Sequence, residues 1–100
     1  MDKVWLTVEE LAYKYPSSLH KHSWYRHLRQ WRESGELTTP ASWITRDGGS
    51  DHPSTFYWET KVLKLIYENR HKPGFCNLIF YKHQEAIVRN LREFTQSVRR

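Results

Sequence analysis

The residues from 5 to 37 have the pattern of two helices joined by a connector, and this pattern constrains the fold more than any other feature. Thr7 and Glu10 have the spacing of a capping box, in which each side chain accepts a hydrogen bond from the backbone N–H of the other residue. The box predicts a helix over residues 8–15. Pro16 is expected to end this helix because its ring clashes with the preceding turn and it has no N–H to donate.

The second helix of the pair is expected over residues 24–34. Ser23 has the side chain of an N-cap, and Gly35 suits the left-handed conformation that often follows the last turn of a helix. Apolar residues recur at helical spacing within this range and predict one buried stripe: Trp24, Leu28 and Trp31. The stripe orients the helix, since its basic side chains then lie on the other sides.

The charge of this helical pair has one sign over most of its length. Between Glu10 and Glu33 the sequence has no acidic residue, but it has the basic residues Lys14, Lys21, Arg26, Arg29 and Arg32 and the histidines His20, His22 and His27. The chain of 100 residues has a formal net charge of +5. Nucleic acid or an acidic protein surface is the natural partner of a chain with this balance.

A β-hairpin and a third helix are expected to follow the pair. Residues 43–46 and 55–58 are rich in aromatic and β-branched side chains, and the stretch between them is rich in turn-forming residues. Thr60 is placed to cap a helix over residues 61–69, with Val62, Leu63, Leu65 and Ile66 buried. Trp24, Trp31, Trp43 and Trp58 are expected to pack in the core, which leaves three tyrosines for the surface: Tyr25, Tyr57 and Tyr81.

The C-terminal part of the chain permits two interpretations. Residues 75–81 fit either a short strand or the first turns of a helix, and from about residue 82 to 98 apolar residues recur at helical spacing: Ile87, Leu91, Phe94 and Val98. This last helix either packs against the rest of the domain and closes its core, or forms the interface of a homodimer. We expect a mainly α fold with a small β-hairpin, divided into a domain over residues 1–72 and a helical extension over residues 73–100.

The two motifs together resemble a known family of DNA-binding domains. WLTVEELAYKY at residues 5–15 and SWYRHLRQWRESGEL at residues 23–37, followed by a hairpin, are similar to the winged helix-turn-helix of phage excisionases and MerR-type domains. The resemblance covers about residues 4–60. It implies that the second helix enters the major groove of duplex DNA and that the hairpin acts as a wing on the adjacent minor groove or backbone.

Candidate DNA-binding residues follow from this resemblance and from side-chain chemistry. Arg26 and Arg29 are expected to read bases, because arginine pairs with guanine, and Lys21, Arg32 and Arg46 are expected to contact phosphates. The full set is Lys21, His22, Ser23, Tyr25, Arg26, Arg29, Arg32 and, on the hairpin, Arg46, Gly48, Gly49 and Ser50.

The expected function is sequence-specific DNA binding, either as an excisionase-like recombination directionality factor or as a small transcriptional regulator. The partners would be double-stranded DNA and, for the first role, an integrase or recombinase. The alternative is a phage-type interaction module that binds and modulates a host protein. We expect no enzyme activity, no cofactor and no metal, since the histidine spacing matches no strong zinc pattern. With a single cysteine, Cys76, and no apolar run of membrane-spanning length, a cytoplasmic protein is expected.

Overall fold

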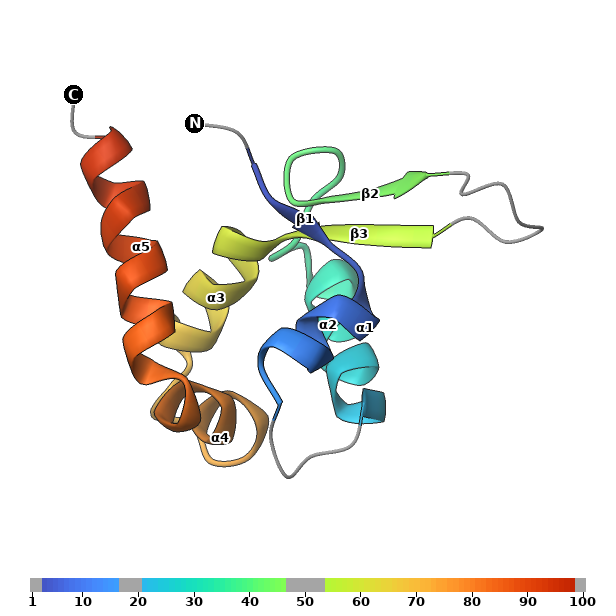
Figure 1. Ribbon diagram of the computed structural model, residues 1–100. Coiled ribbons are helices and arrows are strands. Elements are labelled where there is room, and N and C mark those ends of the chain that lie inside the picture. Colours follow the sequence, from blue (N-terminus) through green and yellow to red (C-terminus); the bar gives the residue numbers. More distant parts are fainter. Residues whose placement is uncertain (1–2, 17–20, 47–53, 99–100) are drawn as a thin grey trace.

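The computed structural model describes residues 3–16, 21–46 and 54–98, with side chains as far as residue 92. It confirms a mainly helical chain with a small antiparallel sheet (Figure 1). In chain order the elements are β1 (Trp5–Leu6), α1 (Val8–Lys14), α2 (Lys21–Ser34), β2 (Trp43–Arg46), β3 (Ser54–Trp58), α3 (Glu59–Glu68), α4 (Phe75–Lys82) and α5 (Gln84–Val98). Within these ranges, no helix has both the length and the apolar character needed to cross a membrane.

The first helix begins as its capping box predicts. The Thr7 hydroxyl accepts from the Glu10 N–H at 3.2 Å, and the Glu10 carboxylate accepts from the Thr7 N–H at 2.9 Å. The predicted N-cap of the second helix is wrong, because α2 begins at Lys21 and Ser23 lies within its first turn. Neither lysine nor histidine breaks a helix, so the two residues before Ser23 can extend it. Gly35 ends α2 with a φ of 87°, as expected.

The sheet has three strands in the order β1-β3-β2, and all pairs are antiparallel. The predicted hairpin is confirmed, with Trp43 opposite Tyr57 and Arg46 opposite Ser54. The short strand β1 adds to its other edge, where Trp5 lies opposite Trp58. The predicted wing tip, Gly48 to Ser50, lies outside the described residues.

The third helix, α3, begins directly after strand β3, so it starts earlier in the chain than the predicted N-cap Thr60. Because α3 begins at Glu59, Thr60 is inside the helix and the prediction that it caps the helix is wrong. Its hydroxyl instead donates to the side-chain oxygen of Asn90 in α5 at 2.9 Å. The ambiguous residues 75–81 are helical, and α4 starts directly after Gly74, whose φ is 104°.

One hydrophobic core joins the helices on both sides of the proposed boundary at residue 72. The predicted stripe of α2 is buried, with Trp24, Leu28 and Trp31 at most 7% exposed. Trp24 packs edge-on against Phe75 of α4, with ring centroids 4.9 Å apart. From α5, Ile87 is fully buried in the same cluster. The first half of α5 therefore packs into this core, which is one of the two roles expected for the last helix. The side chains of Phe94 and Val98 are not among those that the structure describes.

A buried carboxylate ties α1 and α3 together. Glu59 is 2% exposed. Its carboxylate accepts a hydrogen bond from the Tyr15 hydroxyl at 2.6 Å and forms an ion pair with the Lys14 ammonium at 2.6 Å. Burial and the Glu59 carboxylate raise the pKa of Tyr15 far above its usual value. The side-chain amide of Asn90 reaches Glu59 at 3.5 Å, so α5 also joins this network.

Candidate nucleic-acid interface

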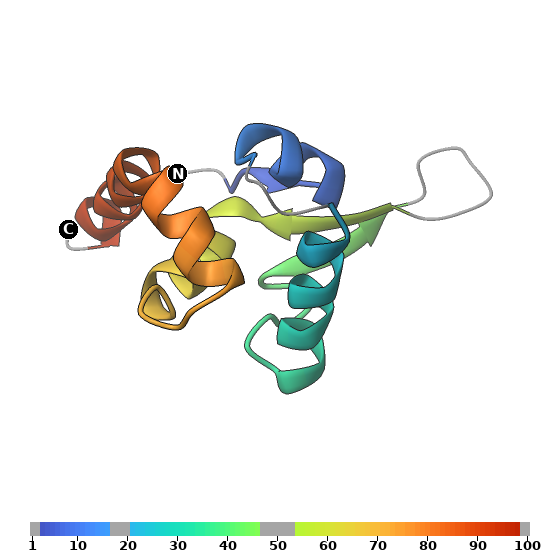
Figure 2. The ribbon, with the colours of Figure 1, turned by 90° about the horizontal axis from the view of Figure 1, so that it is seen from below.

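An open groove of about 1040 Å³ runs between α2 and the sheet. Its walls are the start of α1, the outer side of α2 and one side of the hairpin strands β2 and β3. Figure 2 shows α2 and the hairpin projecting in different directions from the same part of the molecule. The lining residues are Thr7, Val8, Glu9, His22, Tyr25, Arg26, Arg29, Arg32, Glu33, Trp43, Ser54, Thr55 and Tyr57.

The contribution of α2 to this groove is a single polar side of the helix. Its lining residues recur at the spacing of one helical face, opposite the buried stripe: His22, Tyr25, Arg26, Arg29, Arg32 and Glu33. Five of the eleven predicted DNA-binding residues are therefore brought together on one wall. The amphipathic pattern of α2 explains this placement, because burying Trp24 and Leu28 turns the arginines outward.

Arg29 forms an ion pair with Glu33 but can still bind a ligand. Its Nε donates to the Glu33 carboxylate at 3.1 Å, and the two side chains are 79% and 66% exposed. A pair this exposed contributes only about 0.3–0.5 kcal/mol to stability. Among the described residues, the hydrogen bond of Arg29 uses Nε alone, so both terminal nitrogens of the guanidinium are left for a ligand.

Arg32 reaches from the α2 wall of the groove to the hairpin. Its guanidinium carbon lies 4.1 Å from the centroid of the Trp43 ring, which is cation–π geometry. Its Nη1 also donates to the Tyr57 hydroxyl at 3.3 Å. These contacts fix the position of one positive charge between α2 and the hairpin.

Tyr25 connects the two helices at the other end of the groove. Its hydroxyl donates to the Glu9 carboxylate in the first turn of α1. This hydrogen bond is the largest cause that holds the pKa of Glu9 below its usual value, and it also raises the pKa of Tyr25. Glu9 and Glu33 thus place two carboxylates in a groove that is otherwise cationic.

Three predicted site residues that the structure describes lie outside the groove lining: Lys21, Ser23 and Arg46. Lys21 is exposed at the start of α2 and contributes to the lowered pKa of Glu9. Ser23 is partly buried within the first turn. Arg46 is exposed at the end of β2, with its guanidinium 5.9 Å from the Phe56 ring, on the opposite side of the hairpin from Tyr57.

One histidine of the acid-free interval points inward. His27 stacks on Phe75 with ring centroids 4.1 Å apart and an interplanar angle of 15°. Burial, followed by the nearby Arg26, lowers the pKa of His27. The described residues contain no group of three or more histidine, cysteine or acidic side chains that could hold a metal ion.

Two aromatic residues of the hairpin, Trp43 and Tyr57, line the groove. Trp43, expected in the core, packs against the core but is only partly buried and also lines the groove. Tyr57, expected at the surface, is only 3% exposed. The two residues lie opposite each other in the β2–β3 register. Alternation along each strand, together with this register, was the signal that could have placed them on the same side of the sheet.

Comparisons of the chain with models of protein families, with curated proteins and with solved structures found no match.

Proposed function

We propose that this protein binds duplex DNA through the groove between α2 and the hairpin, in the manner of a winged helix-turn-helix. The observation that carries the proposal is the collection of Arg26, Arg29 and Arg32 on one wall of an open groove whose opposite wall is the hairpin. A helix fits the major groove of B-DNA, and a projecting hairpin is suited to contact the adjacent backbone. The proposed role is excisionase-like action in recombination or control of transcription.

Base reading is assigned to Arg26 and Arg29. An arginine recognises guanine by donating two parallel hydrogen bonds to O6 and N7. Arg29 suits this task because Glu33 engages its Nε and leaves the terminal nitrogens for the base. Glu33 is then a positioning residue, since it restricts the orientation of the guanidinium without covering it.

Phosphate contact is assigned first to Arg32. Its stacking on Trp43 and its hydrogen bond to Tyr57 hold the charge in place before DNA arrives, so little side-chain freedom is lost on binding. Lys21, at the exposed start of α2, and Arg46, at the end of β2, are assigned additional phosphate contacts outside the groove lining.

The carboxylates of Glu9 and Glu33 favour selective over indiscriminate binding. A carboxylate near the phosphate backbone costs affinity for every sequence, and only correct base contacts compensate for that cost. The same two residues would favour a protein partner with mixed charge in this groove. Salt dependence separates these two functions, because DNA binding releases counterions and weakens steeply as salt rises.

The test is selection of duplexes from a random pool, followed by fluorescence anisotropy on the enriched sequence. The Arg26→Ala and Arg29→Ala variants should each lose about 1–3 kcal/mol of binding free energy and relax the preference at one base pair. Lys61→Ala, a change on α3 outside the groove lining, is the control and should bind as the wild type does. Unchanged affinity and preference in both arginine variants would contradict the proposal.

A further inference from the structure

A second cationic surface lies on α4 and on the turn that precedes it. Residues 69–84 contain no aspartate or glutamate, but they contain Arg70, Lys72 and Lys82. In Figure 1, α4 lies at the lower end of the molecule, away from strands β2 and β3, and none of its residues lines the groove. This surface is therefore separate from the proposed DNA-binding groove.

Exposed apolar side chains accompany these charges. Tyr81 is 60% exposed, Leu78 is 41% exposed and Tyr67 is 37% exposed. The Phe80 ring contacts both tyrosines, with centroid distances of 5.8 Å to Tyr67 and 5.2 Å to Tyr81. Leu78 lies three residues before Tyr81 on α4, so the two side chains are neighbours on the helix surface. Leu78 and Tyr81 are thus exposed side by side on α4, and the buried Phe80 ring, which is 4% exposed, lies beneath the two tyrosines.

Arg70 fixes one positive charge beside these side chains. Its guanidinium carbon lies 4.0 Å from the Tyr67 ring centroid and 5.8 Å from that of Phe80. It also donates to the backbone carbonyl of Tyr67 at 2.7 Å. We define the α4 surface by six residues: Tyr67, Arg70, Lys72, Leu78, Tyr81 and Lys82.

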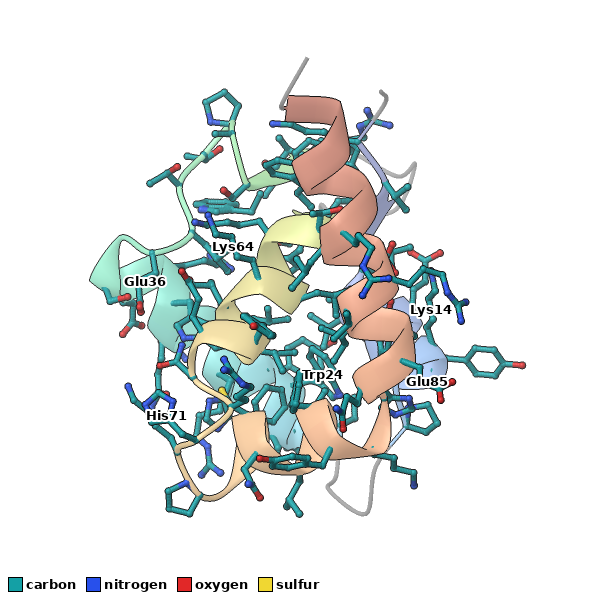
Figure 3. The ribbon with its side chains drawn as sticks, turned by 90° about the vertical axis from the view of Figure 1, so that its left-hand side faces the viewer. Lys14, Trp24, Glu36, Lys64, His71 and Glu85 are labelled. Atoms are coloured by element: carbon teal, nitrogen blue, oxygen red, sulfur yellow. The ribbon has the colours of Figure 1, made fainter. Side chains whose placement is uncertain are left out.

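The nearest acidic residues in the sequence lie at the borders of the acid-free segment. Glu68 ends α3 and Glu85 lies in the first turn of α5. Figure 3 shows Glu85 on the opposite side of this view from His71, which belongs to the turn before α4. Glu85 nevertheless lies close to one end of this surface, because it lines a shallow hollow together with Tyr81 and Lys82. Arg70 and Lys72 lie outside that hollow, so the surface as a whole keeps an excess of positive charge.

We propose that the α4 surface binds an acidic, amphipathic segment of a partner protein. Aromatic residues and arginine are enriched in the energetically important parts of protein interfaces, and carboxylates of the partner would pair with Arg70, Lys72 and Lys82. A second copy of this chain is disfavoured, because a two-fold interface would place the same cationic surface against itself. DNA phosphates would pair with the cations but would gain nothing from Leu78. The proposal is independent of the function assigned to the groove.

The test uses the full chain and a fluorescein-labelled amphipathic helical peptide, with leucine on one face and glutamate on the other, followed by anisotropy. We expect Tyr81→Ser and Leu78→Ser each to weaken peptide binding by about tenfold, as loss of a contact at an interface centre does. Tyr13→Ser is the matched control, since Tyr13 is 89% exposed but lies on α1. It should bind the peptide as the wild type does. Lys82→Glu should also weaken binding, and a peptide with lysine in place of glutamate should fail to bind the wild type.

Three outcomes would overturn the proposal. The first is equal peptide affinity of the wild type, Tyr81→Ser and Tyr13→Ser. The second is a loss of duplex DNA binding or of phosphatidylserine-vesicle binding in Tyr81→Ser, with peptide binding unchanged, which would assign the surface to nucleic acid or to membrane. The third is a concentration-dependent dimer of the wild type that Tyr81→Ser abolishes in sedimentation. Because Tyr81 and Leu78 are exposed, their replacement should leave the circular dichroism spectrum unchanged.

Discussion

Replacing Tyr15 with phenylalanine removes a single hydroxyl, and we expect it to lower the free energy of unfolding by about 2 kcal/mol. The hydroxyl donates to the Glu59 carboxylate at 2.6 Å, and Glu59 is 2% exposed, so water cannot replace the lost donor. A hydrogen bond to a charged group contributes about 1.5–3 kcal/mol. Lys14 keeps its contact with Glu59, which leaves the carboxylate a charged partner and keeps the loss within this range.

The assay is urea unfolding followed by tryptophan fluorescence. With a denaturant slope of about 1–2 kcal/mol per M, a loss of about 2 kcal/mol lowers the urea midpoint by roughly 1–2 M. Tyr13→Phe is the control, because Tyr13 lies in the same helix and is 89% exposed. Its effect should stay within about 0.5 kcal/mol. Unfolding of Tyr15→Phe and Tyr13→Phe at the same urea concentration would show that the Tyr15–Glu59 hydrogen bond does not stabilise the fold.

The same tyrosine gives this prediction a pH dependence. Because the pKa of Tyr15 is raised in the folded protein, the unfolded chain ionises first as the pH rises. The stability that Tyr15 contributes is therefore fully present below about pH 10, the usual pKa of tyrosine, and is lost above it. The loss is about 1.4 kcal/mol per pH unit for one proton, so the stabilities of the wild type and Tyr15→Phe should converge above pH 10.

Three substitutions and one chemical modification test other parts of the structure. Leu28→Ala empties a fully buried position and should cost about 2–5 kcal/mol in thermal unfolding, whereas a cost below about 1 kcal/mol would contradict its packing. Burial raises the pKa of Cys76 to about 11, so the native thiol should react with iodoacetamide at pH 8 far more slowly than the thiol of the urea-unfolded chain. The lowered pKa of His27 means that stability falls as the pH drops below about 6.5, and His27→Gln should flatten this acid-side loss in urea titrations. Trp43→Leu keeps apolar bulk but removes the ring beneath Arg32, and DNA affinity should fall by about two- to fivefold, with no change counting against the role of that stacking.

The features that could be predicted from the sequence depend on neighbours in the chain. The capping box of Thr7 and Glu10 forms within four residues, and the Trp24–Leu28–Trp31 stripe follows from helical periodicity alone. The hairpin strands follow from their composition and from the turn residues between them. Each of these signals is local, so it survives without knowledge of the rest of the fold.

The features that could not be predicted depend on residues far apart in the chain. Thr60 fits the composition of an N-cap, but its partner is Asn90, which comes from α5 and takes its hydroxyl away from the helix start. Glu59 is an acidic residue next to a strand, and only the approach of Tyr15 and Lys14 makes its burial tolerable.

In the groove, too, some features follow from neighbouring residues in the chain and others from residues far apart in it. The outward direction of Arg26 and Arg29 follows from the buried stripe of α2, which the sequence contains. The stacking of Arg32 on Trp43 requires that the hairpin pack against α2 and that strands β2 and β3 pair in the observed register. No local sequence pattern specifies that packing. The inward position of His27 depends in the same way on Phe75 from α4.

The most direct test of DNA binding by the groove is a nuclear magnetic resonance titration of the ¹⁵N-labelled chain with its selected duplex. We predict that the largest amide shift changes fall on α2, from His22 to Glu33, and on strands β2 and β3, which line the groove. The amides of α4 should change little. Shift changes concentrated on α4 and α5, or none at stoichiometric duplex, would contradict the account.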